Sequence, residues 1–353
     1  MTMETRPQAE PLTEPLTPQE SRLRAALRNP TMATFAALLL IIAVFSVLAP
    51  GQFTQGGNFI QLAQNVAILT VVSVGTTFVI ITAGVDLSIP SGIVLGEVFA
   101  VHALQLISVG NGETAVDVAA EQTGPLYILV ALAGALLAGL IIGTINGVVV
   151  AYLRVPPLLA TLGTLGAGLG VALIMQNGVN TATYALDPVG HGQWIPGVPN
   201  LIPIALLVVL GGYVLLHKAV FGRHTYAIGS NPEAARRAGI NVERHLVKVY
   251  IIGGTAAGFA GFLSLAYFST TSIAGHTTDN LQAITAVALG GTSLFGGIGS
   301  ILGTLIGVWI PAVLKNGFVI IGVQPYWQDV AVGFVLIAAV WFDQLRRRSR
   351  DRG

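Results

Sequence analysis

A long polar stretch, YAIGSNPEAARRAGINVERHLVK from Tyr226 to Lys248, interrupts an otherwise apolar chain. Of the 353 residues, 53% are hydrophobic and only 9% are charged, and the mean hydropathy is +0.76. A soluble domain carries roughly 25% charged residues, so this chain could not cover its surface with polar groups in water. The contrast predicts an all-α, polytopic membrane protein that carries one polar, helix-prone loop at about 221–245.

About ten apolar stretches are candidates for helices that cross the bilayer, which takes about 20 residues each. The eighth is short, and Gly-interrupted segments are expected among them. The predicted spans are 31–49, 59–83, 88–108, 125–152, 156–176, 200–220, 246–269, 281–294, 298–319 and 327–343.

The chain divides into three parts on composition. Residues 1–30 are rich in Pro, Thr and Glu and lack a cleavage site after an apolar run, so we expect a disordered cytoplasmic tail and not a signal peptide. The transmembrane domain is expected over 31–345, and a basic cytoplasmic tail over 346–353.

The basic residues set the expected orientation, because short cytoplasmic loops are enriched in Lys and Arg. With both termini cytoplasmic, all of the 17 basic residues except Lys315 fall on the inner side. Six lie in or beside the polar loop: Lys218, Arg223, Arg236, Arg237, Arg244 and Lys248. The segment 109–124 has three acidic residues and no basic one, as an outer loop should.

Glycines recur every fourth residue in several predicted spans, which aligns small residues on one helix face and lets backbones approach closely. This pattern has two interpretations: tight packing within one subunit, or a dimer seam or moving helix contact. The glycines concerned are Gly139, Gly143, Gly147, Gly254, Gly258, Gly299, Gly303 and Gly307.

Two carboxylates lie in or beside the apolar predicted spans, where burying a charged group in the membrane costs free energy. Asp86 lies in ITAGVDLSIPSG (81–92), and it is read either as part of a capped cytoplasmic turn or as part of a broken helix beside a translocation path. Glu97 lies about two turns into the third predicted span. It is expected either to line a pathway or to make a structural hydrogen bond within the membrane.

The source of energy is constrained by what the sequence lacks. No GxxxxGK[ST] phosphate-binding loop occurs, and there are no cysteines and only six scattered histidines, so we expect no catalytic residues, no metal site and no cofactor. An ion-coupled secondary transporter could use Asp86 and Glu97. Otherwise the energy comes from another chain, which needs a cytoplasmic docking surface.

The polar loop could supply that surface. Asn231 can cap a helix, Pro232 suits its first position, and Gly239 can end it. The helix is too short to be stable unsupported, and its Ala-rich face suits burial against a partner. The alternative is a basic loop that only orients the protein in the membrane.

The loop resembles the coupling region of ABC importer permeases, through Glu233, Ala234, Ala235 and Gly239. Together with AGVDLSIPSG, LRVPPLLATLGTL and ITAVALGGTSLFGGIGSILGTLIG, in this order, it is similar to the monosaccharide branch of these permeases: ribose, xylose, arabinose and galactose. The resemblance covers roughly 31–345.

The resemblance implies a multi-pass permease of the bacterial cytoplasmic (inner) membrane that works as a homodimer by alternating access. Its partners would be a cytoplasmic ABC ATPase, an extracytoplasmic sugar-binding protein and membrane lipid, with no nucleic acid. The chain itself would not be an enzyme.

The expected substrate path has five members. Glu97, Thr292 and Ser293, with Asn146 on the fourth span, are expected to face the cavity between subunits, and Phe295 to act as a hydrophobic constriction. Asp86 is placed either in this path or at the cytoplasmic surface. The sequence does not name the sugar, and no aromatic–polar cluster in it is typical of a sugar site.

Overall fold

The computed structural model describes residues 30–109 and 124–324, with scattered residues from 326 to 344. Residues 1–29, 110–123 and 345–353, and with them nearly all of both predicted tails, lie outside the described residues, as does about half of the tenth predicted span. Over the described residues 30–109 and 124–324 the elements are helices: α2 (Pro30–Leu48), α3 (Gly56–Ile81), α4 (Ile89–Val109), α5 (Pro125–Ala151), α6 (Pro157–Met175), α7 (Asp187–Gly190), α8 (Leu201–His217), α9 (Val220–Ser230), α10 (Pro232–Arg237), α11 (Val242–Phe268), α12 (Asp279–Leu289) and α13 (Ile301–Ile320).

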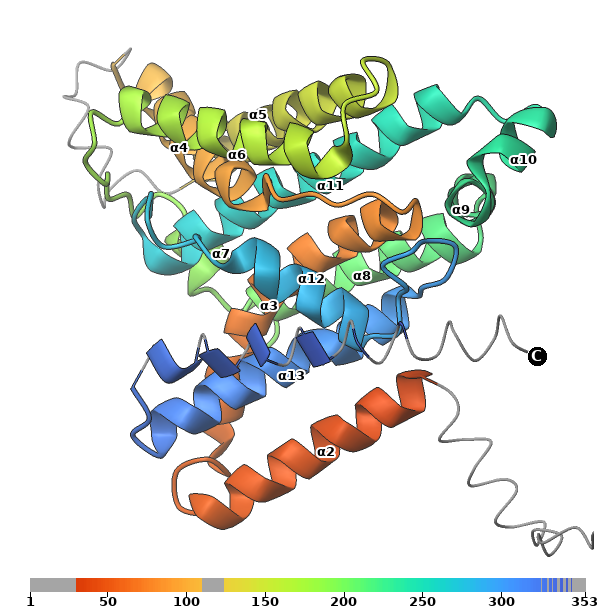
Figure 1. Ribbon diagram of the computed structural model, residues 1–353. Helices are drawn as coiled ribbons and strands as arrows, with labels where there is room; N and C mark the ends of the chain where they lie inside the picture. Colours follow the sequence, from red (N-terminus) through yellow and green to blue (C-terminus); the bar gives the residue numbers. More distant parts are fainter. Residues whose placement is uncertain are drawn as a thin grey trace, which may run out of the picture.

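The long helices lie side by side, and α9 and α10 sit together at one end of the bundle, which we call the α10 end (Figure 1). Helix α11 starts next to α10, so its last residue, Phe268, lies at the opposite end. The last residue of α3, Ile81, is hydrogen-bonded to Gly297 close to α9, so the C-terminus of α3 lies at the α10 end. The N-terminus of α3, at Gly56, therefore lies at the opposite end of the bundle.

An all-α, polytopic membrane protein is confirmed. Seven helices among the described residues are long and apolar enough to cross a membrane, or eight if α8 and α9 form one span bent by 68°. The count of ten stays a prediction. The polar loop is more helical than expected, because α9 precedes the short helix that the sequence predicts.

The eighth predicted span, 281–294, is wrong as a continuous helix. Helix α12 has 11 residues, which rise about 16 Å, half of the roughly 30 Å hydrocarbon core. It stops before Gly290 and Gly291, and Gly291 has φ +86°, a conformation that continues no right-handed helix. A non-helical segment, 290–300, then carries the chain to the α10 end.

The glycine stripes pack inside this one chain. Helix α11 lies against α3, α4 and α5. A Cβ at Gly143 of α5 would stand 2.5 Å from the carbonyl oxygen of Tyr250 on α11, and one at Gly307 of α13 would overlap the carbonyl of Ala286 on α12. Close backbone contact within the subunit is therefore the role of these stripes.

Candidate functional site

A chain of buried hydrogen bonds closes the break between α3 and α4. Asp86 Oδ1 accepts hydrogen bonds from the Ser88 backbone N–H at 2.8 Å and from the Ser88 hydroxyl at 2.6 Å. The Asn146 amide donates to Ser88 Oγ at 2.7 Å, and the Thr164 hydroxyl donates to Asn146 Oδ1 at 2.6 Å. These bonds join the start of α4 to α5 and α6.

This network favours the capped turn over an open path in this conformation. Asp86 is 2% exposed and Asn146 is fully buried. Their polar atoms are used within the protein, as buried polar groups usually are. A role for Asp86 and Asn146 in the substrate path stays a prediction.

Glu97 makes the intramembrane hydrogen bonds that were one of its two interpretations. Its carboxylate is fully buried, accepts from the Ser272 backbone N–H at 2.7 Å and lies 3.1 Å from Nε2 of His276. His276 Nδ1 lies 2.7 Å from the carboxylate of Asp279. The group ties α4 to the segment between α11 and α12 at the opposite end.

The stabilisation that His276 gives through its contacts with Glu97 and Asp279 is expected to depend on pH. Burial alone would lower the pKa of His276, but hydrogen bonds and charge from Asp279 and Glu97 outweigh burial and raise the pKa to about 10. Because this pKa lies above the ordinary 6.5, the stabilisation is fully present below pH 6.5 and is lost as pH rises through about 10.

We therefore expect His276→Gln to lower the thermal unfolding temperature in detergent at neutral pH. The difference from the wild-type protein should shrink as pH rises towards 10. Comparing the two proteins at each pH removes the titration of other groups, and a difference that stays constant over this range would contradict the assignment.

The glycine-rich segment 290–300 packs against the predicted coupling region at about 221–245. Its turns use Gly291, Gly296 and Gly297, with φ of +86°, +84° and +76°. The Gly297 N–H donates to the carbonyl of Ile81 at 2.8 Å. Here Thr292 is 1% exposed, Ser293 9% and Phe295 42%.

The predicted path residues thus fall into three groups and not one. Thr292, Ser293 and Phe295 lie at the α10 end, whereas Glu97 is bonded to the segment at the opposite end, and Asn146 belongs to the Asp86 network. Thr292 Oγ1 is buried without a hydrogen-bond partner among the described residues, so it is free to bond if the segment moves.

Helix α10, the predicted coupling helix, is capped at both ends as its sequence predicts. Asn231 Oδ1 accepts from the Ala234 N–H at 2.9 Å, and Pro232 takes the first turn. At the other end Gly239 has φ +86°, and the Ile240 N–H bonds the carbonyl of Ala235 at 3.1 Å, the six-to-one bond of a Schellman motif.

The two alanines of α10 differ. Ala235 is 4% exposed and packs with Ile228 and Val242, so it holds α10 to the protein, while Ala234 is exposed. Ala235 is therefore covered by this chain itself, and the contact of both alanines with a partner stays a prediction. Glu233 pairs with Arg236 at 3.1 Å and with Arg237 at 3.5 Å. Such exposed pairs are weak, so a partner could replace them.

Helix α9 joins α10 to both interrupted segments, which the sequence did not reveal. The Tyr226 hydroxyl donates to the carbonyl of Gly299 at 2.7 Å. A Cβ at Gly229 would overlap the carbonyl oxygen of Ile81 and stand 2.7 Å from the Gly297 nitrogen. Tyr226 and Gly229 are three residues apart on one helix face, and this spacing was the only sequence signal.

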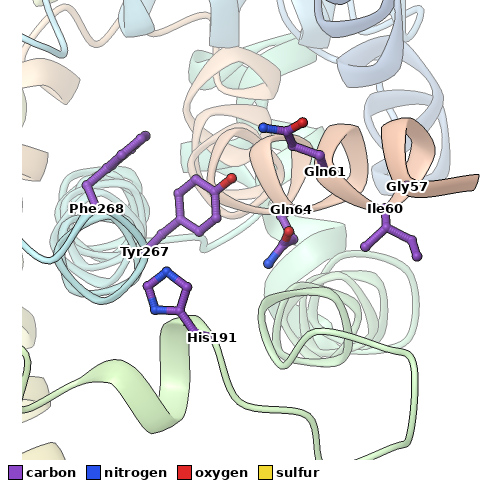
Figure 2. A pocket seen from close by; sticks show the side chains of 7 residues that line it. All are labelled: Gly57, Ile60, Gln61, Gln64, His191, Tyr267 and Phe268. Carbon is purple, nitrogen blue, oxygen red and sulfur yellow. The ribbon is translucent and has the colours of Figure 1, made fainter. Parts of the chain in front are cut away.

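A pocket of about 500 Å³ opens at the opposite end (Figure 2). It brings together aromatic and amide side chains from distant parts of the chain, and its lining is Gly57, Ile60, Gln61, Gln64, His191, Tyr267 and Phe268. This cluster was not among the expected sites, although Gln61, Gln64 and Asn65 form an i, i+3, i+4 polar stripe within the second predicted span.

The comparisons with known proteins agree with this architecture. The family model for the branched-chain amino acid transport system / permease component matches residues 58–340. Ribose import permease protein RbsC of Escherichia coli (strain K12) is 37% identical over 316 residues, 88% of this chain and 92% of the relative.

Two further relatives are similar in extent. RbsC of Bacillus subtilis (strain 168) is 36% identical over 94% of this chain and 98% of its own length. The galactose/methyl galactoside import permease protein MglC of Haemophilus influenzae (strain ATCC 51907 / DSM 11121 / KW20 / Rd) is 32% identical over 89% and 94%. No solved structure matches the chain significantly.

These relatives are transport permeases and not enzymes, and nothing among them or in the paired, buried state of Asp86 and Glu97 favours an ion-coupled transporter. ATP hydrolysis belongs to a separate subunit in such systems. A family model that spans most of the chain and relatives above 30% identity over nearly its full length lead to one conclusion: the chain belongs to the branched-chain amino acid transport system / permease component family, and it is an ABC transporter permease subunit.

Proposed function

We propose that this permease imports a monosaccharide, a pentose or hexose, by alternating access. The substrate class follows the relatives, which are import permeases for ribose, galactose and xylose. The family description names branched-chain amino acids, so the relatives and not the family model support a sugar.

The coupling to ATP rests on one observation, the exposed and doubly capped helix α10. Asn231 and Gly239 fix its ends without help from a partner, Ala235 anchors it, and Ala234 and Glu233 stay on its surface. A short preformed helix costs little entropy to dock, which suits a surface that an ABC ATPase engages repeatedly.

The remaining assembly follows from this assignment. The α10 end, with both termini, faces the cytoplasm, and the opposite end receives an extracytoplasmic sugar-binding protein. Two copies of the permease form a homodimer in the cytoplasmic (inner) membrane and its lipid. Asp86, Glu97, Asn146, Thr292, Ser293 and Phe295 take part when the bundle changes conformation.

Proteoliposomes test this function. The permease reconstituted with its ATPase, its binding protein and ATP is expected to take up one of radiolabelled D-ribose, D-xylose or D-galactose, and the chain alone under a proton or sodium gradient is not. Gradient-driven sugar uptake by the lone chain would overturn ATP coupling. Uptake of leucine in place of every sugar would overturn the substrate class.

A further inference from the structure

The pocket at the opposite end is built from three separate regions of the chain. Helix α3 supplies Gly57, Ile60, Gln61 and Gln64 from its first turns, and the end of α11 supplies Tyr267 and Phe268. His191 comes from the turn after α7. In Figure 2 the Tyr267 ring lies between Phe268 and the two glutamines, with His191 below it.

Its aromatic side is fixed by ring contacts. The His191 and Tyr267 rings are stacked with centroids 6.2 Å apart, and Phe268 meets Tyr267 edge to face at 4.9 Å. A preformed aromatic wall can pack against the apolar face of a small ring at low entropic cost, and aromatic side chains with a few polar groups line most small-molecule sites.

Three of its polar side chains, Gln61, Gln64 and Tyr267, have hydrogen-bonding groups that the described residues leave unused. Among the described residues, neither glutamine amide nor the Tyr267 hydroxyl makes a side-chain hydrogen bond, although each amide offers two donors and one acceptor. Amides within a membrane-spanning helix are costly unless they meet protein, water or substrate. The unused donors and acceptors point to a ligand rich in hydroxyl groups.

The charge of the pocket distinguishes between the two ligand classes that the relatives and the family description raise. The lining has no Lys, Arg, Asp or Glu, and the one ionisable base, His191, already lies 3.6 Å from Asp187. An amino acid brings a carboxylate and an ammonium group that such a lining would leave unpaired. A neutral sugar leaves no charge unpaired, and a volume of about 500 Å³ lies within the usual range for small ligands.

We infer that this pocket is a contact site for the monosaccharide on its way into the permease, with Gln61 and Gln64 bonding its hydroxyls and Tyr267 packing on its ring. The site lies at the end where the binding protein would release the sugar. The inference rests on the proposed sugar import and adds the place where the chain first holds its substrate.

Cysteine protection tests occupancy directly, because the chain contains no cysteine. In the reconstituted homodimer, Gln64→Cys is labelled with a water-soluble maleimide in the presence of D-ribose, D-xylose, D-galactose, leucine or an equal osmolarity of sucrose. The matched control is Asn65→Cys, exposed one residue further along α3 and outside the pocket lining.

At least one monosaccharide is expected to slow the labelling of Gln64→Cys several-fold, while Asn65→Cys is unaffected and leucine and sucrose have no effect. Equal labelling with and without every sugar would overturn the inference. So would complete protection without sugar, because it would mean that the second permease copy or lipid fills the pocket.

Uptake by the full transporter gives the second test. The double variant Gln61→Leu, Gln64→Leu is expected to reduce sugar uptake by about tenfold or more, since at least two hydrogen bonds to the sugar are lost. Asn65→Leu should keep wild-type uptake, and all variants should retain the ATPase on purification, which shows that they fold.

The outcomes separate this inference from the function on which it rests. If the wild-type complex imports no sugar, the proposed function fails. If the wild-type complex imports sugar and the double variant imports it equally well, only the pocket assignment fails.

Discussion

Sugar uptake is expected to fall to background when Gly239 is replaced by valine or Ala234 by tryptophan. Gly239 holds φ +86°, which a β-branched residue adopts at a cost of about 1 kcal/mol or more. Its loss would open the Schellman end of α10 and release the Ile240–Ala235 bond. Ala234 lies on the surface that we assign to the ATPase, where a tryptophan would separate the two proteins.

The measurement is co-purification of the ATPase together with stimulated ATP hydrolysis, and both should fall in parallel. Gly197→Val is the matched control, because Gly197 has a similar φ of +80° and, like Gly239, has open space around it, but lies outside the coupling region. If both α10 variants keep the ATPase bound and stimulated, the polar loop only orients the protein and the docking proposal fails.

A different defect is expected from Gly229→Ala and Tyr226→Phe on α9. The added methyl group at Gly229 would overlap the Ile81 carbonyl and crowd the Gly297 nitrogen, so α9 must move away from both interrupted segments. Tyr226→Phe removes the bond to the Gly299 carbonyl. Because α10 keeps its own caps, the ATPase should stay bound and hydrolyse ATP, while sugar uptake per ATP falls at least tenfold.

The ratio of sugar imported to ATP hydrolysed is the decisive measurement for these α9 variants. Gly211→Ala on α8 serves as control, since open space surrounds that glycine and uptake should be unchanged. A normal ratio in both α9 variants would mean that α9 is a passive spacer. Loss of the ATPase itself would place α9 in the docking surface and overturn its role as the link between α10 and the glycine segments.

The local chemistry of the coupling helix could be predicted, and its environment could not. Asn231, Pro232 and Gly239 act within six or fewer residues of their partners, so their order along the chain specifies both caps. The burial of Ala235 depends on Ile228 and Val242, and the role of Gly229 depends on Ile81 and Gly297. These partners are set by packing that no local pattern encodes.

The predicted residues of the substrate path show the same division between what the sequence predicts and what the tertiary structure decides. The sequence identified Asp86 and Glu97 as carboxylates with two possible environments each, and it assigned Asn146 to the substrate path. Glu97 finds its bonds at Ser272 and His276, more than 170 residues away, and Asn146 finds Ser88 58 residues away. Only the tertiary structure could decide between an open cavity and internal hydrogen bonds.

By itself the sequence determined that this protein lies in a membrane, that it is helical, which family it resembles and how α10 is capped. Apolar runs, charge placement and capping residues can be read locally, because they act over one or two helical turns. Tertiary structure decided the rest. It packs the glycine stripes of α5 and α13 against neighbours in the same chain, it stops α12 at half the membrane thickness, and it brings residues of α3, of the turn after α7 and of α11 together around one pocket. These features depend on backbones meeting across long separations in sequence, where the close contact of whole helices, and not the preference of any single residue, fixes the arrangement.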